Sequence, residues 1–236
     1  MENKKIALVT GGNKGIGREI VRGLLRAGCR VYLGAREAAK GQQAAAELAP
    51  EGEVLFLELD LTSQATLDAA AAQLQREHGC LDILVNNAGI NVAGDGLPST
   101  AAVRSVEQVL HTNFLGTLAV TQTFLPLVRQ AVAGRIVNVS SPLGSLTLNG
   151  QNDWGLLGYS ASKAALNMLT VQLAYELRDT AIRINSAAPG YTATDLNNFA
   201  GTDTPAQGAA EAIRLALLPA DGPTGTTSST TGPLPW

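Results

Sequence analysis

A tyrosine and a lysine four positions apart are the side chains of this sequence best suited to moving a proton. Tyr159 and Lys163 are the ends of the stretch YSASK. On a helix, residues at this spacing lie on one face, one turn from each other. A lysine ammonium beside a tyrosine favours the phenolate, so we expect Lys163 to lower the pKa of Tyr159. Such a phenol can donate a proton to a substrate oxygen or accept one. Taken alone, the spacing is equally typical of a surface pair on an ordinary helix.

A glycine-rich turn near the N-terminus is suited to binding the phosphates of a dinucleotide. A buried strand is predicted at 5–10 and an amphipathic helix at 18–27, and the turn between them has the spacing GxxxGxG. Glycine has no Cβ, so the backbone can approach a pyrophosphate whose charge faces the helix N-terminus. The spacing differs from the usual GxGxxG, and the alternative is a glycine-rich turn without a ligand. The density of glycines favours the phosphate site, whose predicted contacts are Gly11, Asn13, Lys14, Gly15, Ile16 and Gly17.

The residues after the second predicted strand, at 29–34, bear on which dinucleotide binds. At this place an acidic residue binds the ribose 2′-hydroxyl of NAD, whereas a cationic residue accommodates the 2′-phosphate of NADP. Arg36 is cationic, and Lys14 could reach the same phosphate, so two cations would face one dianion. Glu37 stands at the offset expected of an NAD acid, but it could also be an acid at the N-terminus of the next helix. The sequence favours NADP(H) over NAD.

Polar and small residues follow the next two predicted strands, at the edge where open α/β sheets bind ligands. The predicted cofactor contacts there are Asp60 and Leu61 after the strand at 54–59, and Asn87, Ala88 and Gly89 after the strand at 81–85. Asp60 could accept a hydrogen bond from an adenine amino group or cap the next helix. Asn113 lies inside the helix predicted at 103–128, where asparagine is unfavourable. It serves either packing and solvent contact or a polar site.

Strands alternate with helices along the chain, which predicts a single α/β domain spanning residues 1–236. We expect a Rossmann-like, doubly wound, mostly parallel sheet with helices on both faces. Strands are predicted at 5–10, 29–34, 54–59, 81–85, 135–139 and 182–187, and helices at 18–27, 38–48, 65–76, 103–128, 159–178 and 205–217. The segment 143–157 is predicted to be a loop. The polar segment 191–204 is a predicted substrate lid, and 219–236 is an irregular tail with at most one short strand.

Composition excludes several other classes of protein. The net charge is −3 and no basic cluster is present, so nothing supports a nucleic-acid partner. No apolar run approaches the roughly 18 residues of a membrane span. The N-terminus has no apolar leader, so we expect a cytoplasmic protein without membrane contact. Cys29 and Cys80 are too few for a disulfide framework, and no Cys/His cluster has metal-ligand spacing, so no metal site is expected.

Taken together, these motifs resemble the short-chain dehydrogenase/reductase family over residues 4 to about 218. The motifs are TGGNKGIG at 10–17, NNAG at 86–89, Asn113, NVSS at 138–141, YSASK, and PG at 189–190 with the threonines that follow. The resemblance implies a catalytic set of Asn113, Ser141, Tyr159 and Lys163, with Ser140 as a second candidate for the serine. It also implies cofactor contacts to adenine from Asp60, to the neighbouring ribose from Asn87, and near the nicotinamide from Pro189, Gly190, Thr192 and Thr194.

The chain ending and the segment PGYTATDLN resemble the carbonyl reductase branch of that family. The branch implies NADPH-dependent reduction of a ketone or aldehyde. The cofactor would supply the hydride, Ser141 would stabilise the carbonyl oxygen, Tyr159 would donate the proton and Lys163 would hold the nicotinamide ribose. The alternatives are a 3-oxoacyl or hydroxysteroid reductase of the same fold, or a non-catalytic dinucleotide-binding sensor, which would not need Tyr159 and Lys163 together. The partner is a small carbonyl or alcohol substrate, and both a monomer and a homo-oligomer remain open.

Overall fold

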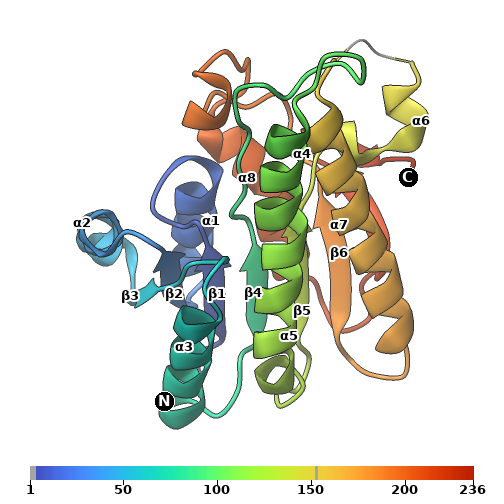
Figure 1. Ribbon diagram of the computed structural model, residues 1–236. Helices are drawn as coiled ribbons and strands as arrows, with labels where there is room; N and C mark the ends of the chain where they lie inside the picture. Colours follow the sequence, from blue (N-terminus) through green and yellow to red (C-terminus); the bar gives the residue numbers. More distant parts are fainter. Residues whose placement is uncertain (1–3, 152–153) are drawn as a thin grey trace.

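The structure is a computed structural model that describes residues 4–151 and 154–236, and its centre is one sheet (Figure 1). The strand order is β3-β2-β1-β4-β5-β6-β7-β8, and every neighbouring pair is parallel except β7 with β8. The bounds are β1 (Ile6–Thr10), β2 (Arg30–Ala35), β3 (Val54–Glu58), β4 (Ile83–Asn86), β5 (Arg135–Val139), β6 (Arg183–Ala187), β7 (Thr226–Ser229) and β8 (Gly232–Pro233).

Helices cover both faces of this sheet, which confirms the predicted fold class (Figure 1). Helices α1, α2 and α8 share one apolar cluster with the sheet, while α3, α5 and α7 share the other. The bounds are α1 (Gly15–Arg26), α2 (Ala38–Leu48), η1 (Ala49–Glu51), α3 (Gln64–Glu77), α4 (Val103–Leu110), η2 (His111–Gly116), α5 (Thr117–Val128), η3 (Pro142–Gly144), α6 (Leu146–Asn149), α7 (Leu157–Glu176), η4 (Asp195–Asn197) and α8 (Pro205–Ala216).

Strand β1 shows why the sequence gives two cores. Successive side chains of a strand point to opposite faces of the sheet. Ala7 and Val9 therefore lie in the cluster under α1 and α8, and Ile6 and Leu8 lie in the cluster under α3, α5 and α7. Full burial of a side chain such as Leu8 contributes roughly 1.5–3 kcal/mol. In the sequence, a strand buried on both faces reads as a short, continuous run of apolar residues. The run stops at the carboxyl edge of the sheet, where polar residues begin.

The predicted helix at 103–128 is interrupted in its middle. The structure has α4, then the wide turn η2, then α5, and Asn113 lies within η2. The Asn113 side chain accepts a hydrogen bond from the Ile90 N–H at 2.8 Å and donates one to the Ile90 carbonyl at 2.9 Å. Wide turns of this kind are frequent at functional sites. The tertiary contact with Ile90 accompanies a local geometry that helix periodicity does not reveal.

Two predictions about irregular segments are corrected. The segment 143–157 contains part of η3 and all of α6, although residues 152 and 153 lie outside the described residues. The tail 219–236 contains two short strands, β7 and β8, where at most one was predicted. Within the segment 191–204, η4 and a bridge between Thr192 and Asp203 are the regular features of the described backbone.

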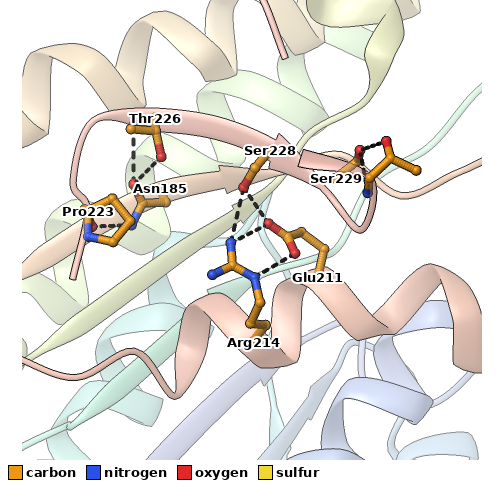
Figure 2. A network of polar contacts seen from close by, with 8 residues as sticks. Asn185, Glu211, Arg214, Pro223, Thr226, Ser228 and Ser229 are labelled. Carbon is orange, nitrogen blue, oxygen red and sulfur yellow. Dashed lines mark hydrogen bonds and ion pairs between the residues drawn. The ribbon is translucent and has the colours of Figure 1, made fainter. Parts of the chain in front are cut away.

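The polar strand β7 is held by polar side chains from its neighbours (Figure 2). Glu211 of α8 is only 2% exposed, and its carboxylate accepts hydrogen bonds from Ser228 and, at 2.7 and 2.8 Å, from Arg214. On β6, the Asn185 side chain accepts from the Thr226 N–H at 3.1 Å. These bonds satisfy groups that would otherwise be buried without partners, so a strand rich in threonine and serine can close this side of the sheet.

Replacing Glu211 with alanine should lower the free energy of unfolding by about 2–3 kcal/mol, because Ser228 and Arg214 both lose a charged partner. Thermal or denaturant unfolding measures the change. Glu176→Ala is the matched control, since Glu176 pairs with Arg129 on the surface, where ion pairs contribute little. Equal losses in the two variants would show that the buried carboxylate does not stabilise β7.

Candidate functional site

The turn between β1 and α1 has the backbone geometry of a phosphate site. Gly11 and Gly15 have φ values of 63° and 54°, which glycine adopts without strain. At Gly17, a Cβ would lie 2.2 Å from the Gly11 carbonyl oxygen and 2.4 Å from Asn87 Nδ2. Only glycine fits at position 17. The N-cap residue of α1, Lys14, makes no side-chain capping bond, so its side chain leaves the first N–H groups of the helix to another partner, such as an anion.

The residues after β4 are tied to this turn. The Asn87 side chain donates to the Thr10 and Gly11 carbonyls at 2.9 and 3.2 Å. The Thr10 hydroxyl in turn accepts from the N–H groups of Asn87 and Ala88, both at 3.0 Å. The contacts thus brace the edge of the sheet. They also bring the predicted cofactor residues at 87–89 beside the glycine turn.

Ser141, Tyr159 and Lys163 converge beyond β5 and on the first turns of α7. Tyr159 is half-buried, and its phenol is paired with the Ser141 side chain. Lys163 Nζ lies 5.5 Å from the centre of the Tyr159 ring and donates to the Val139 carbonyl at 2.7 Å. The spacing of four residues therefore places the phenol and the ammonium on one helix face, as predicted.

The electrostatic prediction for this pair is wrong. Burial raises the pKa of Tyr159 to about 12, and the hydrogen bond with Ser141 opposes that shift without reversing it. Lys163 is 4% exposed, and burial lowers its own pKa to about 8. The loss of water around the phenol thus outweighs any effect of the ammonium, whose hydrogen bond goes to the backbone of β5.

Asn113 is linked to the backbone of Tyr159 by hydrogen bonds through Ser162. Its side chain donates to Ser162 Oγ at 3.1 Å, and Ser162 Oγ donates to the Tyr159 carbonyl at 2.7 Å. A Cβ on Gly89 would lie 3.4 Å from Asn113 Oδ1 and 3.7 Å from Lys163 Nζ. Ser162 was not singled out from the sequence, and its signal is its position three residues beyond Tyr159, from which a serine can bond back to a helix carbonyl.

The two candidate serines have different surroundings. Ser140 is buried, and its hydroxyl donates to Asn167 Oδ1 at 2.6 Å. Ser141 accepts from the Leu143 N–H at 3.2 Å and is the hydroxyl paired with Tyr159. Ser141 thus lies beside the phenol, while Ser140 lies in the packing between β5 and α7.

The cations near the end of β2 differ in their availability. Arg36 is exposed and has no ion-pair partner among the residues that the structure describes, whereas Lys14 pairs with Asp195. Glu37 pairs with Lys40 at 2.8 Å, which lowers the pKa of the Glu37 carboxyl. A glutamate engaged in this way is less available to a ribose than a free one.

Asp60 and Leu61 turn the chain toward α3. Asp60 Oδ1 accepts from the Thr62 N–H and hydroxyl at 2.9 and 2.8 Å, and the bond from the Thr62 backbone is the main cause that lowers the pKa of Asp60. Asp60 therefore braces the turn before α3, whose N-cap is Ser63. Leu61 is buried in the apolar core, so its side chain serves packing.

The segment 191–204 lies against the glycine turn at Thr194 and Asp195. A Cβ on Gly15 would lie 3.3 Å from Thr194 Cγ2, and Thr192 is buried with its hydroxyl donating to the Gly190 carbonyl at 3.0 Å. Of the residues predicted at 189–194, Thr194 therefore lies beside the glycine turn. Ile16 is partly buried and packs against the core beneath the turn.

Neither a metal-binding cluster nor a membrane-spanning helix is found among the described residues. Within residues 4–151 and 154–236, no group of three or more His, Cys, Asp or Glu side chains could hold a metal ion. None of the helices in this part of the chain combines the length and the apolar character that crossing a lipid bilayer requires.

Comparison with known proteins gives consistent matches. The family model described as "short chain dehydrogenase" matches residues 5–205. The NADPH carbonyl reductase 1 of Sus scrofa is 34% identical, over 94% of this chain and 91% of that protein. The (+)-neomenthol dehydrogenase of Capsicum annuum is 30% identical, over 94% of each. The solved Pseudomonas aeruginosa RhlG/NADP active-site complex superposes with a TM-score of 0.86 and 32% identity, over 96% of this chain and 94% of that one.

Proposed function

The chain belongs to the short-chain dehydrogenase family and is an oxidoreductase, and from this premise we propose that it reduces ketones or aldehydes to alcohols with NADPH. The observation that carries the proposal is the pairing of the Tyr159 phenol with the Ser141 hydroxyl, one helical turn from Lys163. Two hydroxyls that meet in this way can both reach the oxygen of one carbonyl group.

Each side chain has a distinct part in the proposed reaction. Ser141 hydrogen-bonds the carbonyl oxygen and stabilises the negative charge that develops there. Tyr159 gives that oxygen its proton, and a pKa near 12 keeps the phenol protonated at neutral pH. Lys163 would present its ammonium group to the nicotinamide ribose, and Asn113 fixes the backbone at Ile90, next to Gly89, on which a Cβ would lie 3.7 Å from Lys163 Nζ. When bound, the dinucleotide supplies the hydride.

The glycine turn fits the dinucleotide on the grounds of space and charge. A Cβ at position 17 would fill the turn, and the N-cap residue Lys14 does not cap the N-terminus of α1 with its side chain. This N-terminus would hold the pyrophosphate. Thr194, which lies beside Gly15, would contact the nicotinamide end. Arg36 would hold the 2′-phosphate, with Lys14 as a second cation that exchanges its pair with Asp195 for the phosphate.

Replacing Arg36 with aspartate should lower the preference for NADPH over NADH, expressed as the ratio of kcat/KM values, by about 10- to 100-fold. The change removes a cation that has no other ion-pair partner among the described residues and adds repulsion toward the phosphate. Steady-state kinetics with both cofactors measures the ratio. Arg76→Asp, the same charge change on the exposed end of α3, is the control. A ratio equal to that of the control would show that Arg36 does not contact the phosphate.

The exposed side chains of three segments favour apolar carbonyl compounds as substrates. Large apolar side chains are exposed at the start of α7, on the loop bonded to it and on the segment 191–204, and they include Leu97, Leu157, Tyr191 and Phe199. Leu97 lies against Gly155, where an added Cβ would stand 3.6 Å from Leu97 Cδ2. Exposed apolar groups beside a reactive site are typical of a binding surface for apolar ligands. The name of the neomenthol dehydrogenase relative points to the same class of cyclic alcohol or ketone.

The direct test is NADPH oxidation in the presence of a panel of carbonyl compounds. The panel contains aryl ketones, diketones, isatin, monoterpene ketones, steroid ketones and a 3-oxoacyl thioester. We expect turnover with apolar ketones and weaker turnover with the thioester. Tight NADPH binding without turnover of any member would instead support a dinucleotide-binding sensor.

A further inference from the structure

The first turn of α7 is held by the loop that follows β4. Asp95 Oδ1 accepts a hydrogen bond from the Gly158 N–H at 2.7 Å, and Asp95 Oδ2 accepts one from the Tyr159 N–H at 2.8 Å. The Leu157 N–H donates to the Gly96 carbonyl at 2.9 Å. These N–H groups have no partners inside the helix. Two adjacent residues from a distant part of the sequence therefore satisfy the start of the helix that carries the phenol.

Helix α7 does not supply a cap of its own. Its N-cap residue is Leu156, which makes no side-chain capping bond. Asp95 replaces such a cap from outside the helix, and its charge strengthens bonds to N–H groups at a helix N-terminus. Gly158 makes the approach possible, because a Cβ there would lie 3.2 Å from Asp95 Oδ1 and 3.1 Å from Val106 Cα.

The position of this carboxylate bears on Tyr159 more than on Lys163. The backbone N–H of Tyr159 is itself one of the two donors to Asp95. Lys163 lies one turn further along, and its ammonium is held separately by the Val139 carbonyl. If the bonds to Asp95 are lost, the first turn can fray and the phenol can move away from Ser141, while the ammonium keeps its own partner.

We propose that Asp95 is a positioning residue for Tyr159: it fixes the first turn of α7 so that the phenol stays paired with Ser141 for proton transfer. The inference rests on the proposed reductase function. It predicts a specific kinetic pattern, since a displaced proton donor slows the reaction but leaves the glycine turn and its cofactor contacts intact. Small displacements of a reacting group can reduce a rate by two orders of magnitude.

The test compares Asp95→Ala, Asp95→Asn and Asp82→Ala. Asp82 is the matched control, since its Oδ2 accepts the Ile6 N–H at 2.7 Å and it lies just before β4, at the opposite end of that strand from the site. With isatin and NADPH, kcat of Asp95→Ala should fall about 10- to 100-fold, and its solvent deuterium isotope effect should rise because proton transfer becomes limiting. Asp95→Asn keeps one acceptor oxygen and should fall in between. The Kd for NADPH should stay within about twofold in all three variants.

A second measurement does not depend on turnover. Amide hydrogen exchange in the peptide that contains 157–159 should speed up in Asp95→Ala and not in Asp82→Ala. The inference is overturned if exchange there is unchanged, if Asp82→Ala loses as much kcat, or if NADPH affinity falls together with kcat. If wild-type protein reduces no carbonyl compound, the proposed function fails, and the exchange result alone decides whether Asp95 holds Tyr159. If Asp95→Ala does not fold, Asp95→Asn serves for both measurements.

Discussion

Tyr159→Phe should lower kcat for carbonyl reduction by about a thousandfold, while the Kd for NADPH changes by less than about threefold. The substitution removes one hydroxyl and keeps the ring, so the packing at the start of α7 is preserved. Ser141 can still hydrogen-bond the carbonyl oxygen, but no neighbouring group can give that oxygen a proton at a comparable rate. Stopped-flow and steady-state kinetics, together with NADPH titration by fluorescence, separate the two effects.

The same helix supplies a control for this experiment. Tyr175 is exposed near the other end of α7 and stacks against Arg178. Tyr175→Phe makes the same chemical change about four helical turns from Tyr159, and its kcat should equal that of the wild type. Activity of Tyr159→Phe near the wild-type level would contradict the role of the phenol and leave only a dinucleotide-binding scaffold.

Lys163→Met should impair both steps of the reaction: we expect NADPH to bind at least about tenfold more weakly and kcat to fall by about a hundredfold. The ammonium group lies 5.5 Å from the centre of the Tyr159 ring, and the side chain of Lys163 is almost fully buried. Lys4→Met, which removes an exposed lysine that pairs with Glu53, is the control. A pure rate effect with unchanged NADPH affinity would count against a contact between Lys163 and the ribose.

The same variant should be more stable than the wild type at neutral pH, by about 2 kcal/mol. Burial lowers the pKa of Lys163 to about 8, so the folded state disfavours its charge, and the loss of one bond to the Val139 carbonyl offsets part of the gain. Between about pH 8 and 10.5 the unfolded wild-type chain binds more protons than the folded one, so wild-type stability rises with pH there. The advantage of Lys163→Met should therefore shrink across this window. Thermal unfolding at several pH values measures it.

The pH dependence of activity follows from the same lysine. Loss of the Lys163 proton above about pH 8 would remove the charge that we propose faces the ribose, so kcat/KM for NADPH should fall as pH rises through this value. Tyr159 remains protonated until far higher pH and contributes no fall in that range.

The amino-acid sequence alone determined the order of the elements and the identity of the motifs. The apolar runs of the strands, the glycine spacing and the four-residue interval from Tyr159 to Lys163 are local properties, and local periodicity decides which face or end of an element each residue occupies. These are the features for which prediction and structure agree, including the parallel sheet and the meeting of strand ends at one edge.

Only the tertiary structure decided how these residues act on one another. Burial raises the pKa of Tyr159, whereas Lys163 was expected to lower it, and no local sequence pattern reports burial. Asn113 and Ile90 are 23 positions apart, yet their hydrogen bonds accompany the wide turn within the predicted helix. Asp95 caps α7 from 63 and 64 positions away, so no motif around Tyr159 could disclose it. Desolvation and long-range hydrogen bonds depend on which segments pack together, and that is known only once the chain is folded.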